Sequence, residues 1–451
     1  MRHCKHTLFL ILTGFGLLFS LSIAPAQEKQ EQDTYRDLET FADVLTLLQQ
    51  HYVDPIDTNK VIIGAINGML SSLDPHSSYM APDEFKELQE ETKGSFSGIG
   101  IEITIKDAIL TVVSPIEGTP AFKAGIRAGD QIIGIDGAST KNMTLMQAVK
   151  KLRGKKGSKV TITVYHPADQ SIRDLTLARD IIPLHSVKSM DLAPGLVYIR
   201  ISNFQTATTA EVRKALHQAG KHGQLKGLVL DLRNNPGGLL DQAVKVSDIF
   251  LDSGVIVSTR GRDREQDMIF RAHRNTEAMR FPMVVLVNGG SASASEIVAG
   301  ALKDHGRAII CGTVTFGKGS VQTIIPMADG AGIRLTTARY YTPSGASIQE
   351  TGIRPDVIVP FVEPSPEKRE TQKARPWEIR EKDLPGHFRN NKKETKATGK
   401  DDDQYSKARE KLRKDNQLRA AYIILKSLNI AARKEQKTAR EQLPQESSDQ
   451  E

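Results

Sequence analysis

Apolar residues recur at every third or fourth position between residues 34 and 73, which is the period of an amphipathic helix. The pattern is interrupted at Asp54 and Pro55, so we expect one helix before this turn and one after it. The apolar stripes are Leu38, Phe41, Leu45, Leu48 and Tyr52 in the first helix, and Val61, Ile62, Ala65, Ile66, Met69, Leu70 and Leu73 in the second. Such a stripe has to be covered, and packing on the chain's own core is one way to cover it.

From residue 96 to about residue 178 the pattern changes to short strand-like runs separated by glycine turns. Strands are expected at 101–103, 131–136 and 159–165, and a helix at 144–152. The glycines of FSGIGIEI at 96–103 allow consecutive backbone N–H groups to face a carboxylate. The strand that follows them can accept an added peptide strand, which is one mode of peptide recognition.

Three mostly apolar runs, at 194–204, 227–232 and 283–287, predict further strands. The last two each lead into a glycine-rich turn and then into a helical pattern. The first of these helices has its apolar face at Leu240, Ala243, Val244 and Ile249, and the second begins near Ala294 with Ile297, Val298, Ala301 and Leu302. A short strand is expected at 308–310, and alternation predicts another strand at 333–341.

The two ends of the chain differ from this pattern. Residues 1–26 combine a basic start (Arg2 and Lys5), an uncharged apolar stretch at 7–23 and a small-residue site at 24–26, which predicts a cleaved signal peptide. An uncleaved anchor is the alternative, because the stretch is close to membrane-spanning length.

After Pro360 the chain is rich in proline and charge, and residues 392–403 and 442–451 are expected to be disordered or loose. A helix is expected at 416–432. Its apolar face is Leu418, Ala421, Ile424, Leu425 and Leu428.

The charge distribution and the cysteine content argue against some kinds of protein function and some kinds of cross-link. The formal net charge of +7 comes from the two ends, because residues 361–451 alone hold 22 Lys and Arg against 17 Asp and Glu. Residues 27–360 are therefore close to neutral, and a nucleic-acid-binding core is not indicated. Cys4 lies in the signal, which leaves Cys311 without an intramolecular partner, and we expect it to be a small buried apolar residue.

The turn before the helix at Ala294 has the features of a nucleophile site. Ser293 stands where the first helical N–H groups have no partners, so an oxyanion formed there could bind the N–H of Ala294. Lys318 lies between two glycines and next to Phe316. Apolar surroundings lower the pKa of a lysine and allow it to act as a base. The alternative is that Ser291, Ser293 and Ser295 are only helix caps.

A Ser–His–Asp triad fits less well, although Asp304 and His305 are near in sequence. His305 would lie about 18 Å along the helix axis from Ser293, which is out of reach. The G-x-S-x-G elbow is also absent from the sequence. Asp231 is expected to pair with Arg233 rather than to serve as a triad acid.

The motifs SASASE at 291–296 and FGKGSVQ at 316–322 resemble the active site of the carboxy-terminal processing peptidases, the PDZ-containing serine proteases of family S41. The serine and the lysine stand 25 residues apart, as in that family. The resemblance covers about residues 35–360. It implies Ser293 as the nucleophile of a Ser–Lys dyad, Lys318 as its general base and Gln322 as the residue that orients the lysine.

The same resemblance implies the binding residues. An oxyanion would be held by Ala294 and by a glycine of the turn DLRNNPGG at 231–238, either Gly237 or Gly238. A free, apolar C-terminus of a substrate would bind the PDZ loop at Gly98, Ile99, Gly100 and Ile101. Arg153 is either a solvated arginine, which we take as the default, or a link between PDZ occupancy and the active site.

The implied fold is multidomain α+β, with a PDZ domain, a crotonase/ClpP-like α/β protease core and helical N- and C-terminal regions. We divide the chain into a signal peptide (1–26), an N-terminal helical region (27–95), a PDZ domain (96–180), a serine protease core (181–362) and a charged tail with a C-terminal helix (363–451).

The implied function is an exported endopeptidase of the periplasm or cell envelope that cuts proteins near their C-termini. It is anchored to the inner membrane if the signal is not cleaved. The alternative is a catalytically silent PDZ scaffold in the envelope. Expected partners are protein substrates, an adaptor or activator, and a second copy bound through the terminal helices. No nucleic acid, metal or cofactor is expected.

Overall fold

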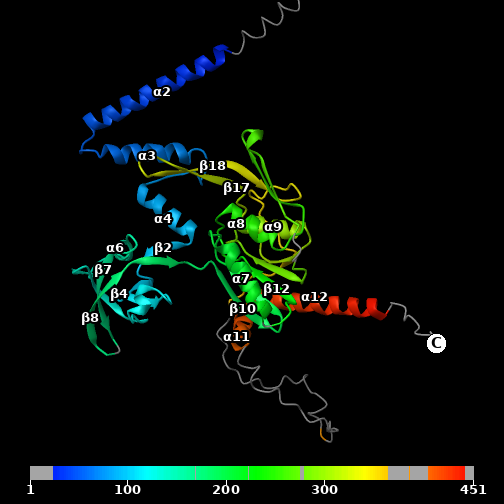
Figure 1. The fold of residues 1–451 in the computed structure, drawn as a ribbon. Coiled ribbons are helices and arrows are strands. Elements are labelled where there is room, and N and C mark those ends of the chain that lie inside the picture. The colour runs from blue at the N-terminus through cyan, green and yellow to red at the C-terminus, as the bar shows by residue number, and fades with distance from the viewer. Residues whose placement is uncertain are drawn as a thin grey trace, which may run out of the picture. The chain divides into compact units, whose positions relative to one another are not determined.

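The computed structural model of the chain describes residues 24–167, 169–221, 223–274, 279–363, 385 and 405–441 (Figure 1). Most of the predicted signal segment lies outside the described residues, as do the charged run 392–403 and the end 442–451. The chain divides into two compact units, 1–79 and 80–451, each of which is described by itself.

The first unit contains the two predicted helices, α2 (Ala24–His51) and α3 (Thr58–Ser71), and the start of the short strand β1 (Ser78–Met80). Helix α3 begins after Asp57, whose carboxylate accepts a hydrogen bond from the Lys60 N–H at 3.2 Å. The apolar stripe of α2 is exposed, with Leu38 58% accessible. None of the described helices in either unit is both long enough and apolar enough to cross a membrane.

The second unit begins with α4 (Pro82–Lys93) and the sheet that the glycine-rich pattern predicted. Its elements are β2 (Ser95–Gly98), β3 (Ile101–Lys106), β4 (Ile109–Pro115), α5 (Pro120–Lys123), β5 (Gln131–Ile135), β6 (Ala138–Ser139), α6 (Leu145–Leu152), β7 (Lys159–His166), β8 (Ser171–Ala178) and β9 (Asp180–Pro183). The main sheet has the order β3-β4-β5-β7-β8, and β2 pairs with β9. Alternate residues such as Ile132, Ile162 and Val164 fill one buried core.

The next part of the chain forms a six-stranded sheet of order β10-β11-β12-β15-β16-β19. The strands are β10 (Val187–Ala193), β11 (Leu196–Ile201), β12 (Gly227–Asp231), β15 (Met283–Val287), β16 (Ile309–Gly312) and β19 (Val357–Ile358). All neighbouring pairs are parallel except β10 with β11. A smaller sheet is built from β13 (Val255–Gly261), β14 (Met268–Arg271), β17 (Ser320–Pro326) and β18 (Gly332–Tyr341), with the 3-10 turn η1 (Arg264–Gln266) before β14. In it, β18 pairs with both β13 and β17.

Two different sets of helices cover the two faces of the six-stranded sheet. Leu228, Leu230 and Val285 pack in the same cluster as residues of α7 (Thr208–Lys221), α8 (Leu240–Asp248) and α9 (Ala294–Asp304). Val229, Val284 and Leu286 pack in another cluster with the tail helices α11 (Ser406–Lys414) and α12 (Asn416–Glu441). Burial on both faces is why the central strands are apolar throughout rather than alternating.

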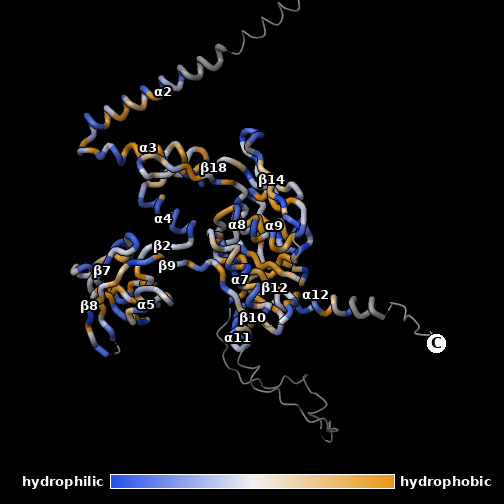
Figure 2. Tube along the Cα trace, in the orientation of Figure 1, coloured by the Kyte–Doolittle hydropathy of each residue, from blue (hydrophilic) through white to orange (hydrophobic). Residues whose placement is uncertain are grey.

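The tail helix therefore belongs to the folded core. Along the apolar face predicted for 416–432, Leu418, Ala421 and Leu425 are fully buried. In Figure 2 apolar residues run along the strands around β12. Cys311 lies in the same buried cluster, and burial raises the pKa of its thiol to about 11. This agrees with the expected role of a small apolar residue.

Candidate active site

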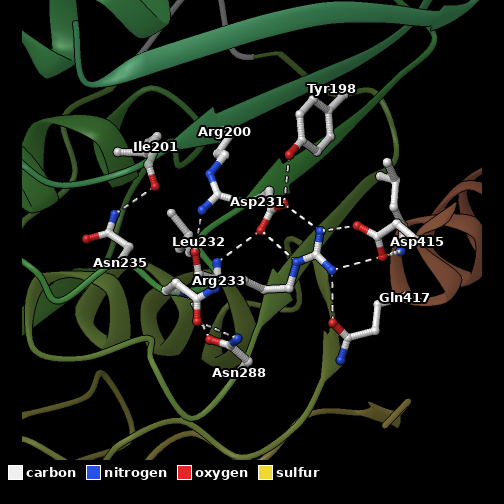
Figure 3. A network of polar contacts seen from close by, with 12 residues as sticks. Tyr198, Arg200, Ile201, Asp231, Leu232, Arg233, Asn235, Asn288, Asp415 and Gln417 are labelled. Atoms are coloured by element: carbon white, nitrogen blue, oxygen red, sulfur yellow. Dashed lines mark hydrogen bonds and ion pairs between the residues drawn. The ribbon is translucent and has the colours of Figure 1, made fainter. Parts of the chain in front are cut away.

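Two turns meet at the carboxyl end of the six-stranded sheet. Strands β12 and β15 are parallel neighbours, so the glycine turn after β12 and the serine-rich turn after β15 emerge side by side. The Asn234 N–H donates to Asn288 Oδ1 at 2.9 Å, and Asn288 Nδ2 donates back to Asn234 Oδ1 at 2.9 Å. The two turns are thereby joined through their asparagines, and Figure 3 labels Asn288 at this junction.

The three serines of SASASE have different surroundings. Ser291 Oγ donates to the carbonyl of Leu232 at 2.8 Å, and Ser295 Oγ donates to the carbonyl of Asn235 at 2.9 Å. Both hydroxyls therefore hold the serine-rich turn to the glycine turn. Ser293 instead has an unusual backbone, with φ 53° and ψ −113°, and is 9% exposed. Such strain in a non-glycine residue is typical of functional sites.

A buried carboxylate connects Ser293 with the lysine loop, which we define as residues 313–319 between β16 and β17. Glu296 Oε2 accepts the N–H of Ser293 at 2.8 Å and the N–H of Lys318 at 2.9 Å. Its Oε1 accepts the N–H of Gly317 at 2.7 Å and the hydroxyl of Thr315 at 2.5 Å. The structure thus brings the backbones of the two predicted dyad residues onto one oxygen atom. Our sequence reasoning missed Glu296, although a serine followed three residues later by a glutamate is the pattern of a capping box.

The four hydrogen bonds to the Glu296 carboxylate lead to a testable prediction about the candidate active site. Replacing Glu296 with glutamine leaves one accepting oxygen for four donors, and each unsatisfied buried donor costs about 1–3 kcal/mol. We expect a lower thermal midpoint and a fall in kcat of about 10-fold or more, because the lysine loop shifts relative to Ser293. Peptidase assays and thermal unfolding check this, with the exposed Glu265→Gln as the matched control. Unchanged kcat in the Glu296 variant would show that this carboxylate does not hold the site.

The structure also shows where Lys318, Phe316 and Gln322 lie. Lys318 is partly buried and lies between Gly317 and Gly319. Phe316 is 62% exposed, so in this structure it does not provide the apolar cover that its position next to the lysine suggested. Gln322 lies on β17, where its Nε2 donates to Ser320 Oγ at 2.8 Å and to Thr336 Oγ1 at 3.4 Å. Its role in orienting the lysine stays a prediction.

Tyr340 is a site residue that sequence reasoning did not single out. The side chain of Ser293 interacts with its hydroxyl, and its backbone N–H donates to the carbonyl of Gly319 at 2.7 Å. Burial raises the pKa of Tyr340 to about 12, although the interaction with Ser293 opposes this shift. The phenol is therefore protonated at neutral pH. No local pattern in the sequence marks Tyr340, because strand pairing brings it to the site.

The predicted oxyanion residues lie beside Ser293. Ala294 is the first residue of α9 and is buried. A Cβ atom on Gly237 would lie 2.9 Å from Ser293 Cβ and 3.1 Å from the Ala294 nitrogen, and one on Gly238 would lie 2.2 Å from the Phe204 carbonyl oxygen. Both glycines have positive φ, so larger residues do not fit. The Gly237 N–H already donates to Asn235 Oδ1 at 2.9 Å, and both glycines stay candidates for the second donor.

The rejected triad residues have structural contacts. Asp231 forms two hydrogen bonds with the guanidinium of Arg233, at 3.0 and 2.7 Å, which confirms the expected pairing (Figure 3). His305 follows the last residue of α9, at the opposite end of the helix from Ser293, and its Nε2 lies 2.7 Å from the Val255 carbonyl oxygen. Within the part of the chain that the structure describes, no cluster of acidic, histidine or cysteine side chains could hold a metal ion.

A separate apolar cavity lies along β3 and α6. Its volume is about 360 Å³, and its lining includes the four predicted residues Gly98, Ile99, Gly100 and Ile101. Gly100 has φ 79°, and a Cβ atom there would lie 2.3 Å from Thr119 Cβ, so this loop requires glycine. The side chain of Ile99 is also buried among the core residues of the sheet.

Arg153, at the edge of this cavity, is not a simply solvated arginine. Its guanidinium pairs with Glu90 at 3.4 Å and lies over the ring of Phe96, 4.9 Å from the ring centroid. The side chain is still 37% exposed, so it is partly solvated and is also held by two neighbouring side chains.

Three protein-family models match the chain. The family model described as "Peptidase family S41" matches residues 195–359, the "PDZ domain" model matches residues 87–165, and the "Activating protease CtpB N-terminal domain" model matches residues 19–84.

Two curated relatives are similar over most of the chain. The carboxy-terminal-processing protease of Bartonella bacilliformis is 47% identical over 82% of this chain and 84% of its own length. The carboxy-terminal processing protease CtpA of Bacillus subtilis is 40% identical over 69% of this chain and 66% of its own. Among solved structures, the photosystem II D1 C-terminal processing protease is 37% identical, covers 71% of this chain and 86% of that chain, and has a TM-score of 0.42.

Proposed function

The chain belongs to peptidase family S41, the carboxy-terminal processing serine proteases with a PDZ domain, and we propose that it cleaves proteins near their free C-termini with a Ser293–Lys318 dyad. The observation that carries this proposal is Glu296, whose single oxygen accepts the N–H groups of both dyad residues. Ser291 and Ser295 are occupied in joining the two turns, which leaves Ser293 as the serine for the reaction.

In the proposed mechanism Lys318 removes the hydroxyl proton of Ser293 as Oγ attacks the carbonyl carbon of the scissile peptide bond. The tetrahedral oxyanion accepts hydrogen bonds from the N–H of Ala294 and from an N–H of the glycine turn. The ammonium group of Lys318 then protonates the leaving amine, and the C–N bond breaks. Water hydrolyses the resulting ester of Ser293, with Lys318 again acting as the base.

The exposure of Phe316 suggests how activity is controlled. A lysine base has to be neutral, and a free lysine titrates near pH 10.4, so apolar cover is needed to lower its pKa. Since Phe316 is mostly exposed in this structure, we propose that a bound substrate strand completes the cover over Lys318. The enzyme is then at rest without substrate.

The PDZ cavity supports capture of the substrate tail. Its walls are apolar, and the loop of Gly98 and Gly100 allows backbone N–H groups to bind a terminal carboxylate. We further propose export to the periplasm or envelope through the predicted signal and self-association through the terminal helices. The exposed stripe of α2 is consistent with self-association. An adaptor or activator and the domain boundaries given above remain predictions.

Tail capture predicts that an amidated substrate is cut less well. We expect the KM of an unfolded protein with an apolar C-terminus to rise about 10- to 100-fold when its carboxylate is amidated, because charge-assisted hydrogen bonds worth about 1.5–3 kcal/mol are lost. The rate at saturation should change little, since the reacting bond is the same. The assay uses purified residues 27–451 and measures kcat and KM separately.

Two controls make this assay specific. Ser293→Ala should cut neither substrate, which assigns the cleavage to this site. Equal KM values for the acid and the amide would refute carboxylate capture by the PDZ domain and leave the protease assignment untouched.

A further inference from the structure

Residues of the C-terminal tail bind Arg233, which lies in the glycine turn of the candidate active site. Arg233 is the second residue after β12, at the start of the glycine turn, and its side chain is buried. Its guanidinium lies between two carboxylates (Figure 3). Nε and Nη2 donate to Asp231 at 3.0 and 2.7 Å, and Nη1 and Nη2 donate to Asp415 at 3.0 and 2.7 Å. Asp415 follows Arg233 by 182 residues and links α11 to α12.

A second tail residue binds the same guanidinium. Arg233 Nη1 donates to Gln417 Oε1 at 2.9 Å, while Gln417 Nε2 donates to the carbonyl of Val359 at 2.7 Å. Asp415 also accepts the N–H of Leu418 at 2.9 Å, as a cap of α12 does. The junction of the two tail helices is therefore fixed to Arg233 by directional hydrogen bonds, in addition to the apolar packing of α12.

The two carboxylates of this cluster share the Arg233 guanidinium, and Arg200 lies 3.8 Å from Asp231. Burial by itself lowers the pKa of Arg233, but the hydrogen bonds to Asp231 and Asp415 outweigh it and raise the pKa above its ordinary value. Burial raises the pKa of Asp415, and the hydrogen bond from Arg233 outweighs that and lowers it. Asp231 accepts a further hydrogen bond from the Tyr198 hydroxyl at 2.8 Å. Loss of Asp415 alone would therefore leave Arg233 with a charged partner, Asp231.

The glycine turn that contains Arg233 lies beside Ser293 at its other end. The next residues, Asn234 and Asn235, bind Asn288 and the carbonyl of Ile201, and Asn235 accepts the hydroxyl of Ser295. Gly237 then lies against Ser293 and Ala294. The side chain of Arg233 holds the start of the turn, and Asn234 and Asn235 hold its middle. A buried ion pair contributes little net stability, so its position at this turn points to geometry rather than to folding energy.

We propose that Asp415 and Gln417 are positioning residues for catalysis: by holding Arg233 they fix the glycine turn beside Ser293, so that the C-terminal helices complete the active site. This inference rests on the proposed function, in which that turn supplies an oxyanion donor. Displacement of such a turn by about 1 Å is enough for a loss of about 100-fold in rate.

The test compares Asp415→Asn with the intact protein. Asparagine still caps α12, but it cannot accept two charge-assisted hydrogen bonds from Arg233. We expect kcat to fall about 10- to 100-fold with KM within about twofold, because substrate capture is unchanged. The matched control is Glu410→Gln, which removes an exposed pair with Lys414 on the same tail helix, and its kcat should equal that of the intact protein.

A second measurement does not depend on cleavage. Hydrogen–deuterium exchange of a peptide covering residues 231–240 should be faster in Asp415→Asn than in the control, both in the active protein and in the Ser293→Ala background. Arg233→Lys should give the same two effects, and the double variant should lose no more activity than Arg233→Lys alone.

The outcomes separate the two proposals. If Asp415→Asn melts at a lower temperature but has unchanged exchange at 231–240 and kcat within twofold, the tail only docks and the inference is wrong. If the intact protein neither cleaves an unfolded substrate nor is labelled by a serine-directed acylating probe, the proposed function fails, while the exchange data still decide whether the tail holds the turn.

Discussion

Substitution of Ser293 by alanine is expected to reduce kcat/KM for protein cleavage by at least about 10⁴-fold, because the variant has no atom that can form the acyl-enzyme. The fold should be unchanged, since the buried bonds that join the two turns come from Ser291 and Ser295. The measurement is cleavage of an unfolded protein by purified residues 27–451, together with titration by a serine-directed acylating probe.

The neighbouring serines are matched controls for this result. Ser295→Ala leaves the Asn235 carbonyl without the hydroxyl that donates to it, so it should lower stability by about 1–3 kcal/mol while keeping measurable cleavage and labelling. A Ser293 variant that still cleaves and is still labelled would contradict the assignment of the nucleophile. Labelling of the intact protein without cleavage would indicate an enzyme that needs a partner, and neither labelling nor cleavage would favour the silent scaffold.

Replacing Lys318 with arginine should cost at least about 10³-fold in kcat, even though the positive charge is kept. Arginine does not lose its proton in proteins, so it cannot accept the proton of Ser293. The backbone bond from residue 318 to Glu296 is independent of the side chain and should persist. Single-turnover acylation measured with the unfolded substrate isolates the affected step.

Lys303→Arg serves as the control for this substitution. Lys303 is another lysine of the protease core, paired with Asp356 at 3.1 Å, and arginine can form the same ion pair. Its rate of acylation should stay within about twofold of the intact protein. Full activity of Lys318→Arg would exclude a lysine base at this position.

Several elements were predictable because their residues alone determine them. Strand β15 and the start of α9 agree with the prediction, since five apolar residues followed by a glycine- and serine-rich turn exclude most other structures. The two N-terminal helices, the PDZ strands and the tail helix also lie where periodicity placed them. The elements β10, α7, β13, β14 and β17 were not predicted. Several of them are partly exposed and have mixed patterns that do not identify a strand or a helix.

The sequence by itself predicted the chemistry that we propose for the candidate site, because the serine and lysine motifs are local and their spacing is specific. Only the tertiary structure decided which groups surround them. Glu296 is part of the serine motif, but three of its four hydrogen bonds form only when the lysine loop folds back onto α9. Tyr340 reaches Ser293 through the folding of a different sheet. The contact of Asp415 with Arg233 spans 182 residues, and no pattern of neighbouring residues can encode a hydrogen bond that depends on how two distant segments pack.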